Sequence, residues 1–500
     1  MSGQPLTAHR RLWALGSRLS APIWVATGLA LLVGLLTLTT THAQTPPDRS
    51  KAPALGATPQ LKVPPIEKRT LSNGLPVWIV EQHEVPLAQV NLVIHAGSGD
   101  DPATAFGLAS LTAAMLDEGA GARTALQIAD EVEFLGASLG TSSSFDASAV
   151  RLNVPVRQLR PALAVMADVA LRPTFPAPEV ERLRQERLTA LLQAKDDAAS
   201  IAPLAFARVV FGPSHRYGTP AAGTAATLKA MTADEMRRFH AGHYLPSNAT
   251  LIVEGEVTAS GVMPLLEEAF GKWPKAGAVA RTAVPTARQL TAGQITLVDM
   301  PSAEQSQVRI GWVGVPRSTP DYFALVVLNT ILGGSFTSRL NQNLREEHGY
   351  SYGASSRFDM RLSAGAFQAG AGVQTDKTAD ALREFFKELR GISAPITDVE
   401  LAKAKNYVAL GFPSEFETIS DLTGHLEEMA VYKLPDTYFS QYIANVQAVT
   451  AAAVQKAATT YLQPDKFAVV VVGDRKAIEP AVRALNLAPV RTVTVDEVLP

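Results

Sequence analysis

Histidine and cysteine, the residues that most often bind a transition metal or act in catalysis, are sparse in this sequence. Cysteine is absent from all 500 residues, which excludes disulfides, thiolate metal sites and a cysteine nucleophile. His240 and His243, in "FHAGHY", are three residues apart near the expected end of a helix, but no acidic third ligand lies nearby in sequence. We interpret them as a capping or packed pair beside Tyr244. Metal-independent hydrolysis has little support, because there is no G-x-S-x-G elbow and Ser110 has no histidine close in sequence.

Composition indicates a globular protein without a polyanionic partner. Hydrophobic residues make up 47% of the chain, which is enough for extensive cores. The formal net charge is −2 and no long basic or acidic run occurs, so we expect no nucleic-acid partner.

The N-terminus has the pattern of an export signal. Three arginines precede the apolar run "APIWVATGLALLVGLLTL", and "THAQ" follows, with Thr41 and Ala43 at the small positions that signal peptidase reads. We expect a signal peptide over residues 1–43, cleaved after Ala43, and a periplasmic protein with no stable membrane association. The alternative is an uncleaved inner-membrane anchor facing the periplasm, because the run approaches the length of a spanning helix.

The rest of the chain divides into two halves that resemble each other. We expect a Pro-rich tether at 44–65, an N-terminal domain at 66–274, a linker at 275–296 and a C-terminal domain at 297–500. "YLPSNATLIVEGEV" has a counterpart in "YLQPDKFAVVVVGD", and "FPAPEVERLR" in "SAPITDVELAK", at offsets of about 217–219 residues. These agreeing offsets indicate an internal duplication, with two units of about 210 residues.

Each half combines strands and helices. "LPVWIVEQ", "AQVNLVIHAG" and "SAVRLNVPV" read as strands, whereas "TALQIADEVEFLG", "RQLRPALAVMADVAL" and "EVERLRQERLTALLQA" have helical spacing. "GLASLTAAMLDEG" also reads as a helix, with one apolar side formed by Leu108, Leu111, Met115 and Leu116. This order of strands and helices predicts an α+β fold of two duplicated α/β units. Each unit is expected to be a mainly antiparallel sheet with helices packed on one face.

The stretches "LSNGLPVWIVEQHEVPLAQVNLVIHAGSGDDPATAFGLASLTAAMLDEGAGART" and "FGPSHRYGTPAAGTAATLKAMTADEMRRFHAGHYLPSNATLIVEGEV" resemble the insulinase/pitrilysin-type (inverzincin, processing-peptidase-like) zinc metallopeptidases. The resemblance extends over nearly everything after residue 65. It implies that the helix after the glycine loop is the one that carries H-x-x-E-H in the family. There, two histidines on one helix face bind zinc and the glutamate activates the metal-bound water.

This sequence departs from that motif at every ligand position. The histidine, glutamate and histidine positions fall on Ser110, Ala113 and Ala114, and the third ligand of the family falls on Thr189 or Ala190. Glu186, one helical turn from these two positions, is the only acidic residue that could replace the third ligand. The resemblance therefore implies that this chain holds no metal or other cofactor.

The second half keeps another signature of the family. In "SFTSRLNQNLREEHGYSYGASSRF" we expect a helix capped by Ser335 and ended by Gly349, followed by an aromatic strand. Arg345 in "LRE" and Tyr352 seven residues later match the arginine and tyrosine that, in the family, donate to the peptide carbonyl as it becomes an oxyanion. Without the resemblance, Arg345 would merely complement a helix C-terminus and Tyr352 would merely pack.

Together these features predict the non-zinc-binding subunit of a heterodimeric peptidase. A homologous partner with H-x-x-E-H would hold the zinc, and this chain would supply Arg345, Tyr352 and half of a chamber for peptides or unfolded polypeptides. Gly140 and Thr141 stand where the family's substrate-binding edge strand usually has Asn-Ala, which fits a first half released from substrate binding. The alternative is a catalytically inert scaffold or peptide-binding protein of the same fold.

Overall fold

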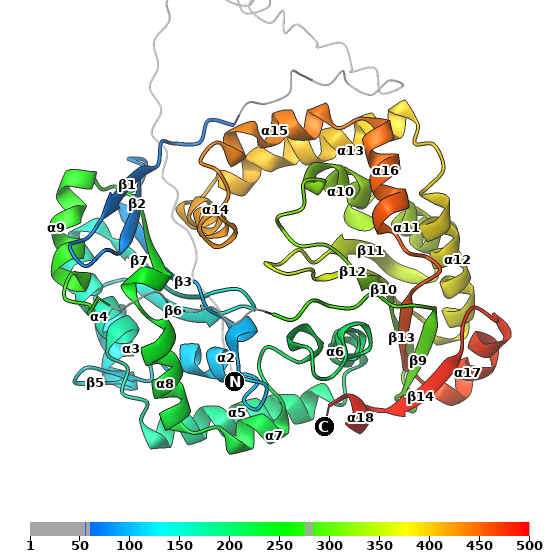
Figure 1. Cartoon of the computed structure of the whole chain (residues 1–500), viewed down its shortest axis with the longest axis horizontal. Helices are drawn as coiled ribbons and strands as arrows, with labels where there is room; N and C mark the ends of the chain where they lie inside the picture. Colours follow the sequence, from blue (N-terminus) through cyan, green and yellow to red (C-terminus); the bar gives the residue numbers. More distant parts are fainter. Residues whose placement is uncertain (1–55, 57–60, 276–278, 280–283, 500) are drawn as a thin grey trace, which may run out of the picture. The chain divides into compact units, whose positions relative to one another are not determined.

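The computed structural model describes residues 56, 61–275, 279 and 284–499. The expected signal peptide at 1–43 and most of the tether at 44–65 therefore lie outside the described residues. Within the described part, the chain forms two six-stranded sheets, one in each half, surrounded by helices (Figure 1).

The first sheet is mainly antiparallel. Its central strands are apolar and buried, and β2 and β8 are its only parallel neighbours among the described residues. In spatial order the strands are β1 (Glu67–Thr70), β2 (Pro76–Glu81), β8 (Ala249–Gly255), β3 (Leu87–Ile94), β7 (Ser148–Pro155) and β6 (Ser138–Ser143).

The second sheet repeats this arrangement. Antiparallel pairs again dominate, with β13, β9 and β14 parallel to one another. Read in the matching direction, the strands are β14 (Val490–Thr494), β9 (Gln294–Asp299), β13 (Ala468–Gly473), β10 (Gln305–Val313), β12 (Ala366–Gln374) and β11 (Ser351–Phe358). The echoed segments of the sequence thus become β8 and β13, each third in its sheet, as a duplication requires.

Helices fill the intervals between the strands. Those of the first half are α2 (Leu108–Ala114), α3 (Ala125–Phe134), α4 (Leu159–Leu171), α5 (Ala177–Ala194), α6 (Ala198–Phe211), α7 (Ala225–Ala230), α8 (Ala233–His243) and α9 (Ala259–Phe270), with a small hairpin of β4 (Gly119–Ala120) and β5 (Arg123–Thr124). Those of the second half are α10 (Tyr322–Asn329), α11 (Arg339–Asn341), α12 (Thr378–Gly391), α13 (Asp398–Gly411), α14 (Ile419–Tyr432), α15 (Tyr438–Ala448), α16 (Ala451–Tyr461), α17 (Arg475–Ala484) and α18 (Val495–Val498).

The expected α+β fold is confirmed, with one addition. Besides the helices on its outer face, each sheet is covered on the opposite face by one helix from the other half of the chain (Figure 1). Helix α6 packs on β13 and β10, where Phe206 lies among the valines of the second sheet, and α14 packs on β3 and β8 of the first sheet. We call α6 and α14 the exchanged helices. Periodicity within a half could not reveal them, because their apolar partners are far away in sequence.

Three local expectations need correction. Helix α2 ends at Ala114, well before Gly119, although the four apolar residues named for it are all buried. Ser335 does not cap the following helix. Its hydroxyl donates instead to the carbonyl oxygen of Thr330 (3.0 Å), and the helix begins after Ser338. Strand β9 begins at Gln294, inside the segment assigned to the linker, because "ITLV" is buried beside β13.

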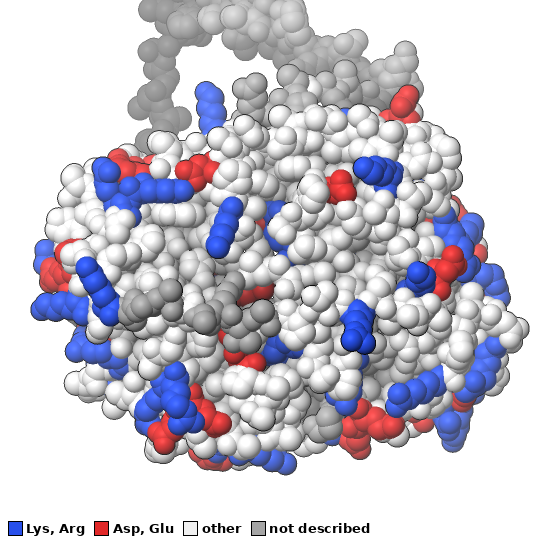
Figure 2. All heavy atoms as spheres, viewed as in Figure 1, with Lys and Arg blue, Asp and Glu red and all other residues white. Residues whose placement is uncertain are grey.

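The helical stretch Tyr322–Glu347 is, among the described residues, the one segment long and apolar enough to cross a membrane by length and composition. Half of its most apolar window is buried inside the protein, which suits a core helix equally well. Cations and acids are interspersed over the face seen in Figure 2, without a large area of one sign.

Candidate functional site

The positions that correspond to the zinc motif lie on α2, which the fold places beside α5. Ala113 is buried and Ser110 and Ala114 are half-buried. Helix α2 starts at the end of the glycine loop, where Gly107 has a φ of 93° and the backbone of Gly223 lies so close that a side chain could not fit. The helix expected after the glycine loop is therefore present, and the three positions that correspond to the zinc motif carry no histidine or glutamate.

A cation lies against this part of α2. Arg187 of α5 donates from Nη1 to the hydroxyl of Ser110 (3.2 Å) and from Nη2 to the carbonyl oxygen of Ser110 (2.9 Å). Burial lowers the pKa of the Arg187 guanidinium below its ordinary value. A guanidinium at the first ligand position repels a divalent cation, so the residues present do not fit zinc. Sequence reasoning missed Arg187, although it directly follows Glu186.

The remaining candidates on α5 do not restore a site. Thr189 and Ala190 are exposed, and the Thr189 hydroxyl donates to the carbonyl oxygen of Gln185 (2.8 Å). The carboxylate of Glu186 lies 3.5 Å from the guanidinium of Arg182. In the described part of the chain, no three histidine, aspartate or glutamate side chains are grouped so that they could hold a metal ion.

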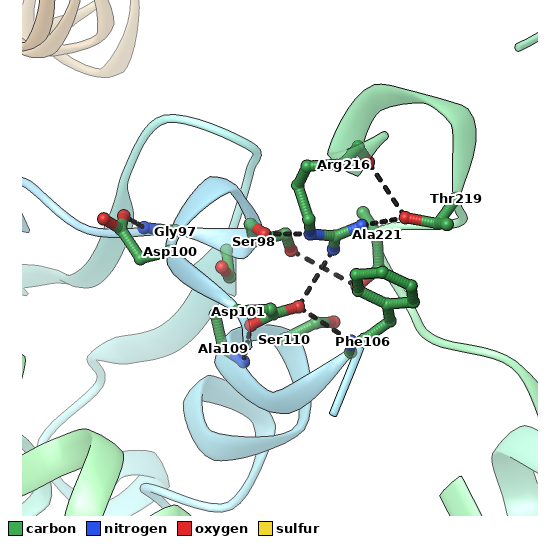
Figure 3. A network of polar contacts seen from close by, with 12 residues as sticks. Gly97, Ser98, Asp100, Asp101, Phe106, Ala109, Ser110, Arg216, Thr219 and Ala221 are labelled. Carbon is green, nitrogen blue, oxygen red and sulfur yellow. Dashed lines mark hydrogen bonds and ion pairs between the residues drawn. The ribbon is translucent and has the colours of Figure 1, made fainter. Parts of the chain in front are cut away.

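A buried ion pair fixes the loop that leads into α2 (Figure 3). Asp101 accepts hydrogen bonds from the backbone N–H of Gly107 (2.7 Å) and Ala109 (2.8 Å), which caps the N-terminus of the helix. Arg216 donates to the same carboxylate at 2.9 Å, and also to the carbonyl oxygen of Ser98. Burial raises the pKa of Asp101 to about 6, against the opposing effects of Arg216 and the two N–H groups. The pair joins "GSGDDPATAFG" to "SHRYG", a contact that the sequence did not predict.

The histidines make structural contacts. His240 shares a hydrogen bond with the carbonyl oxygen of Ala170 (2.8 Å) and stacks on Tyr244, with ring centroids 4.5 Å apart. Burial lowers the pKa of His240. His243 lies against the ring of Phe239 at 4.3 Å. These contacts agree with the interpretation of a packed pair.

Arg345 and Tyr352 lie on adjoining elements of the second half. Arg345 is in the π-helical segment η6 (Gln342–Glu347), with its guanidinium 4.5 Å from the ring centroid of Phe336 and its Nε 3.3 Å from Glu346. Tyr352, on the edge strand β11, is 92% exposed. By contrast, Tyr350 is half-buried and stacks on His348. Tyr352 therefore does not pack, and its hydroxyl is accessible.

Comparison with known proteins gives a consistent family assignment. Residues 77–203 match the profile of insulinase (peptidase family M16), and residues 230–408 match that of the peptidase M16 inactive domain. An uncharacterized zinc protease of Mycobacterium tuberculosis is 29% identical over 363 residues, covering 72% of this chain and 82% of the relative. Another, from Mycobacterium leprae, is 28% identical over 68% of this chain and 76% of the relative.

Solved structures agree with this assignment. A peptidase M16 inactive domain from Pseudomonas fluorescens is 27% identical with a TM-score of 0.76, covering 82% of this chain and 98% of that one. The periplasmic protease PqqL from Escherichia coli shares the fold at 17% identity and a TM-score of 0.67, covering 86% of this chain and 50% of that one.

Proposed function

Because the chain belongs to the insulinase family of peptidases (family M16), we propose that it is the non-zinc-binding subunit of a periplasmic heterodimeric peptidase. A homologous partner with an intact H-x-x-E-H motif would supply zinc, water and base. This chain would supply Arg345, Tyr352 and half of the chamber in which peptides or unfolded polypeptides are cut.

The exposure of Tyr352 is the observation that carries this proposal. An aromatic residue that is 92% exposed on an ordered strand contributes little to folding, so a role in packing does not explain it. Arg345 is also partly exposed, with 36% of its side chain accessible, and its carboxylate contact is a weak one with its sequence neighbour. A guanidinium and a phenol held near a peptide carbonyl can each donate to the oxygen as negative charge develops on it.

Reconstitution with the partner tests these roles. We expect Arg345→Ala to lower kcat by about 100-fold, with a smaller change in KM, because the hydrogen bond strengthens in the transition state. Tyr352→Phe should change kcat in the same direction. Tyr350→Phe is the matched control, since Tyr350 stacks on His348. Assembly is measured separately by size-exclusion chromatography. An Arg345→Ala complex that assembles and cleaves at the unmutated rate would show that this chain is only a scaffold.

The metal content of the isolated chain tests the other half of the proposal. With Arg187 against Ser110, we expect no stoichiometric zinc after dialysis and no chelator-sensitive peptidase activity. One tightly bound zinc per chain would contradict this and would direct attention to Glu186 or to His240 and His243.

The proposed location has its own test. The N-terminal pattern and the periplasmic protease of the same fold from Escherichia coli support export. We expect the mature protein to begin near Gln44 and to fractionate with soluble periplasmic material. Recovery of the intact apolar run in membranes by N-terminal sequencing would select the anchored form.

An inert scaffold or peptide-binding protein is the second candidate. The match of residues 230–408 to a profile described as an inactive domain favours it. The neighbouring reading frames separate the two candidates, because a heterodimeric peptidase requires a similar chain with H-x-x-E-H.

A further inference from the structure

The second sheet has a polar area beside the exchanged helix α6. Helix α6 packs mainly on β13 and β10, so the same face of β12 and β11 is covered less. Arg309 pairs with Gly370, and Gln368 with Arg357, in the strand register. Because side chains alternate along a strand and residues 368 and 370 are two apart, these four residues share one face. Two arginines from β10 and β11 therefore point to the same side of β12.

Glycines on β12 give the long side chains room to lie across the sheet. A Cβ atom at Gly370 would be 2.9 Å from Cδ and 3.2 Å from Nη1 of Arg309. A Cβ atom at Gly372 would likewise be 2.7 Å from Nε2 of Gln307. The guanidinium of Arg309 thus lies over the backbone of β12, in the direction of Arg357 on β11. We call Arg309, Arg357 and Gln368 the arginine floor.

No carboxylate neutralises these two arginines within the described residues. Arg309 donates to the carbonyl oxygen of Val308 (2.8 Å) and to Oε1 of Gln307 (3.4 Å), and neither arginine forms an ion pair there. Helix α6 contains no acidic residue. Burial lowers the pKa of Arg309 below its ordinary value, and the positive charge of Arg357 lowers it further. Arg309 is half-buried and Arg357 is exposed, and these two like charges repel each other until an anion binds between them.

Two hollows adjoin Arg357. The larger, of about 650 Å³, is polar and includes Tyr322, Asn329 and Tyr432. Its carboxylates are already engaged, since Glu428 accepts from Arg317 and Asp359 pairs with Arg361.

The smaller hollow, of about 170 Å³, lies between the two halves of the chain. Gln368 lines it together with the aromatic side chains of Phe145, Phe206 and Tyr217. An anionic group bound at Arg357 would therefore have space on both sides for the rest of a ligand.

We propose that the arginine floor binds a carboxylate of a peptide. The planar guanidinium of an arginine matches a carboxylate with two parallel hydrogen bonds, and a second arginine adds charge and a fixed direction. The carboxylate is either the C-terminus of the peptide or an acidic side chain within it. The inference rests on the proposed function only in taking a peptide as the ligand.

Three alanine-rich nonapeptides without other acidic residues test the proposal by isothermal titration calorimetry on the purified full chain. One ends in a free carboxylate, one in an amide, and one in an amide but with a central glutamate. We expect at least one carboxylate peptide to bind about tenfold or more tightly than the plain amide. The peptide that shows the preference identifies the source of the carboxylate.

The variants Arg309→Gln and Arg357→Gln should each abolish this preference. Arg383→Gln is the matched control, because Arg383 is an exposed arginine on α12 paired with Asp380. Arg357 is itself exposed, so its variant is expected to fold even if Arg309→Gln does not. Equal binding or no binding of the three peptides would overturn the proposal, as would a preference that survives in Arg357→Gln. Arg345→Ala should retain the preference, which separates this test from that of the proposed function.

Discussion

The two sheets are each covered by a helix from the other half, but their arginines have different environments. On the first sheet, Arg151 donates to Glu427 of α14 from Nε (2.7 Å) and Nη2 (2.5 Å), and the side chain of Glu427 is 13% exposed. On the second sheet, α6 supplies no acid and Arg309 has no carboxylate partner among the described residues. The two sheets thus have the same strand order, but they differ in the helix that covers them. Helix α14 brings a carboxylate to the first sheet, and α6 brings none to the second.

The loop before α2 extends this contrast. Asp101 and Arg216 form an ion pair whose side chains are 0% and 4% exposed. Arg151 and Arg216 of the first half are thus paired with carboxylates, whereas Arg309 of the second sheet has no carboxylate partner among the described residues. Removing the carboxylate of a buried pair leaves an uncompensated charge and is costly, while an arginine without a carboxylate partner remains available to a ligand.

The largest effect is expected for Asp101→Ala. The change leaves the buried Arg216 without its counter-charge and removes the cap of α2, so we expect a loss of about 3–5 kcal/mol in the free energy of unfolding. Urea denaturation measures it. Asp234→Ala, which removes an exposed partner of Arg237, is the control and should cost less than about 0.5 kcal/mol. A comparable small loss for Asp101→Ala would show that the loop pair does not hold the first half together.

Glu254 makes the stability of the first sheet depend on pH in a way that has no counterpart in the second sheet. It is fully buried on β8 and accepts from Thr423 of α14 at 3.0 Å, whereas β13, its counterpart, has no acidic residue. Burial raises the pKa of Glu254 to about 8, so the folded state holds its proton more tightly than the unfolded state does. The contribution of Glu254 to the free energy of unfolding is therefore fully present below about pH 4.5. It is lost as the pH rises through about 8, where the buried carboxyl group loses its proton.

The variant Glu254→Gln removes that titration. We expect the wild type to lose stability relative to Glu254→Gln between about pH 5 and 9, by up to a few kcal/mol, since one pKa unit corresponds to about 1.4 kcal/mol. Unfolding in urea at several pH values measures the difference. Parallel pH profiles of the two proteins would contradict the assignment.

A moderate effect is expected where α14 meets the first sheet. Arg151→Met leaves Glu427 without its main counter-charge, and we expect a loss of about 1–3 kcal/mol, because Arg151 is 39% exposed and solvent offsets part of the cost. Thermal and urea unfolding report it. An unchanged stability would mean that the Arg151–Glu427 pair does not help to hold the exchanged helix on the first sheet.

The smallest effect completes the comparison. Arg309→Met removes a charge that has no carboxylate partner, so we expect a change within about 1 kcal/mol, neutral or stabilising. The same unfolding experiment, run beside Arg151→Met, measures both sheets under one condition. A loss for Arg309→Met as large as that for Arg151→Met would show that the two arginines have equivalent structural roles.

Much of the fold could be predicted from local sequence. The strand at "AQVNLVIHAG" and the helix at "TALQIADEVEFLG" were predicted correctly, because alternation and helical spacing reflect burial on one side of an element. The errors at Ser335 and at the end of α2 have a different origin. Capping depends on backbone hydrogen bonds that residue types alone do not specify, as the bond from Ser335 to Thr330 shows.

The sequence by itself determined the duplication, the family and the absence of ligand residues at Ser110, Ala113 and Ala114, since each depends on residue identity and spacing along the chain. Only the tertiary structure decided which groups meet across long separations. It placed Arg187 against Ser110, and it placed Arg309 on the sheet face that α6, a helix without acidic residues, covers. The physical reason is that the charge state of a buried site depends on every neighbour in space, and most of those neighbours belong to other elements of the chain.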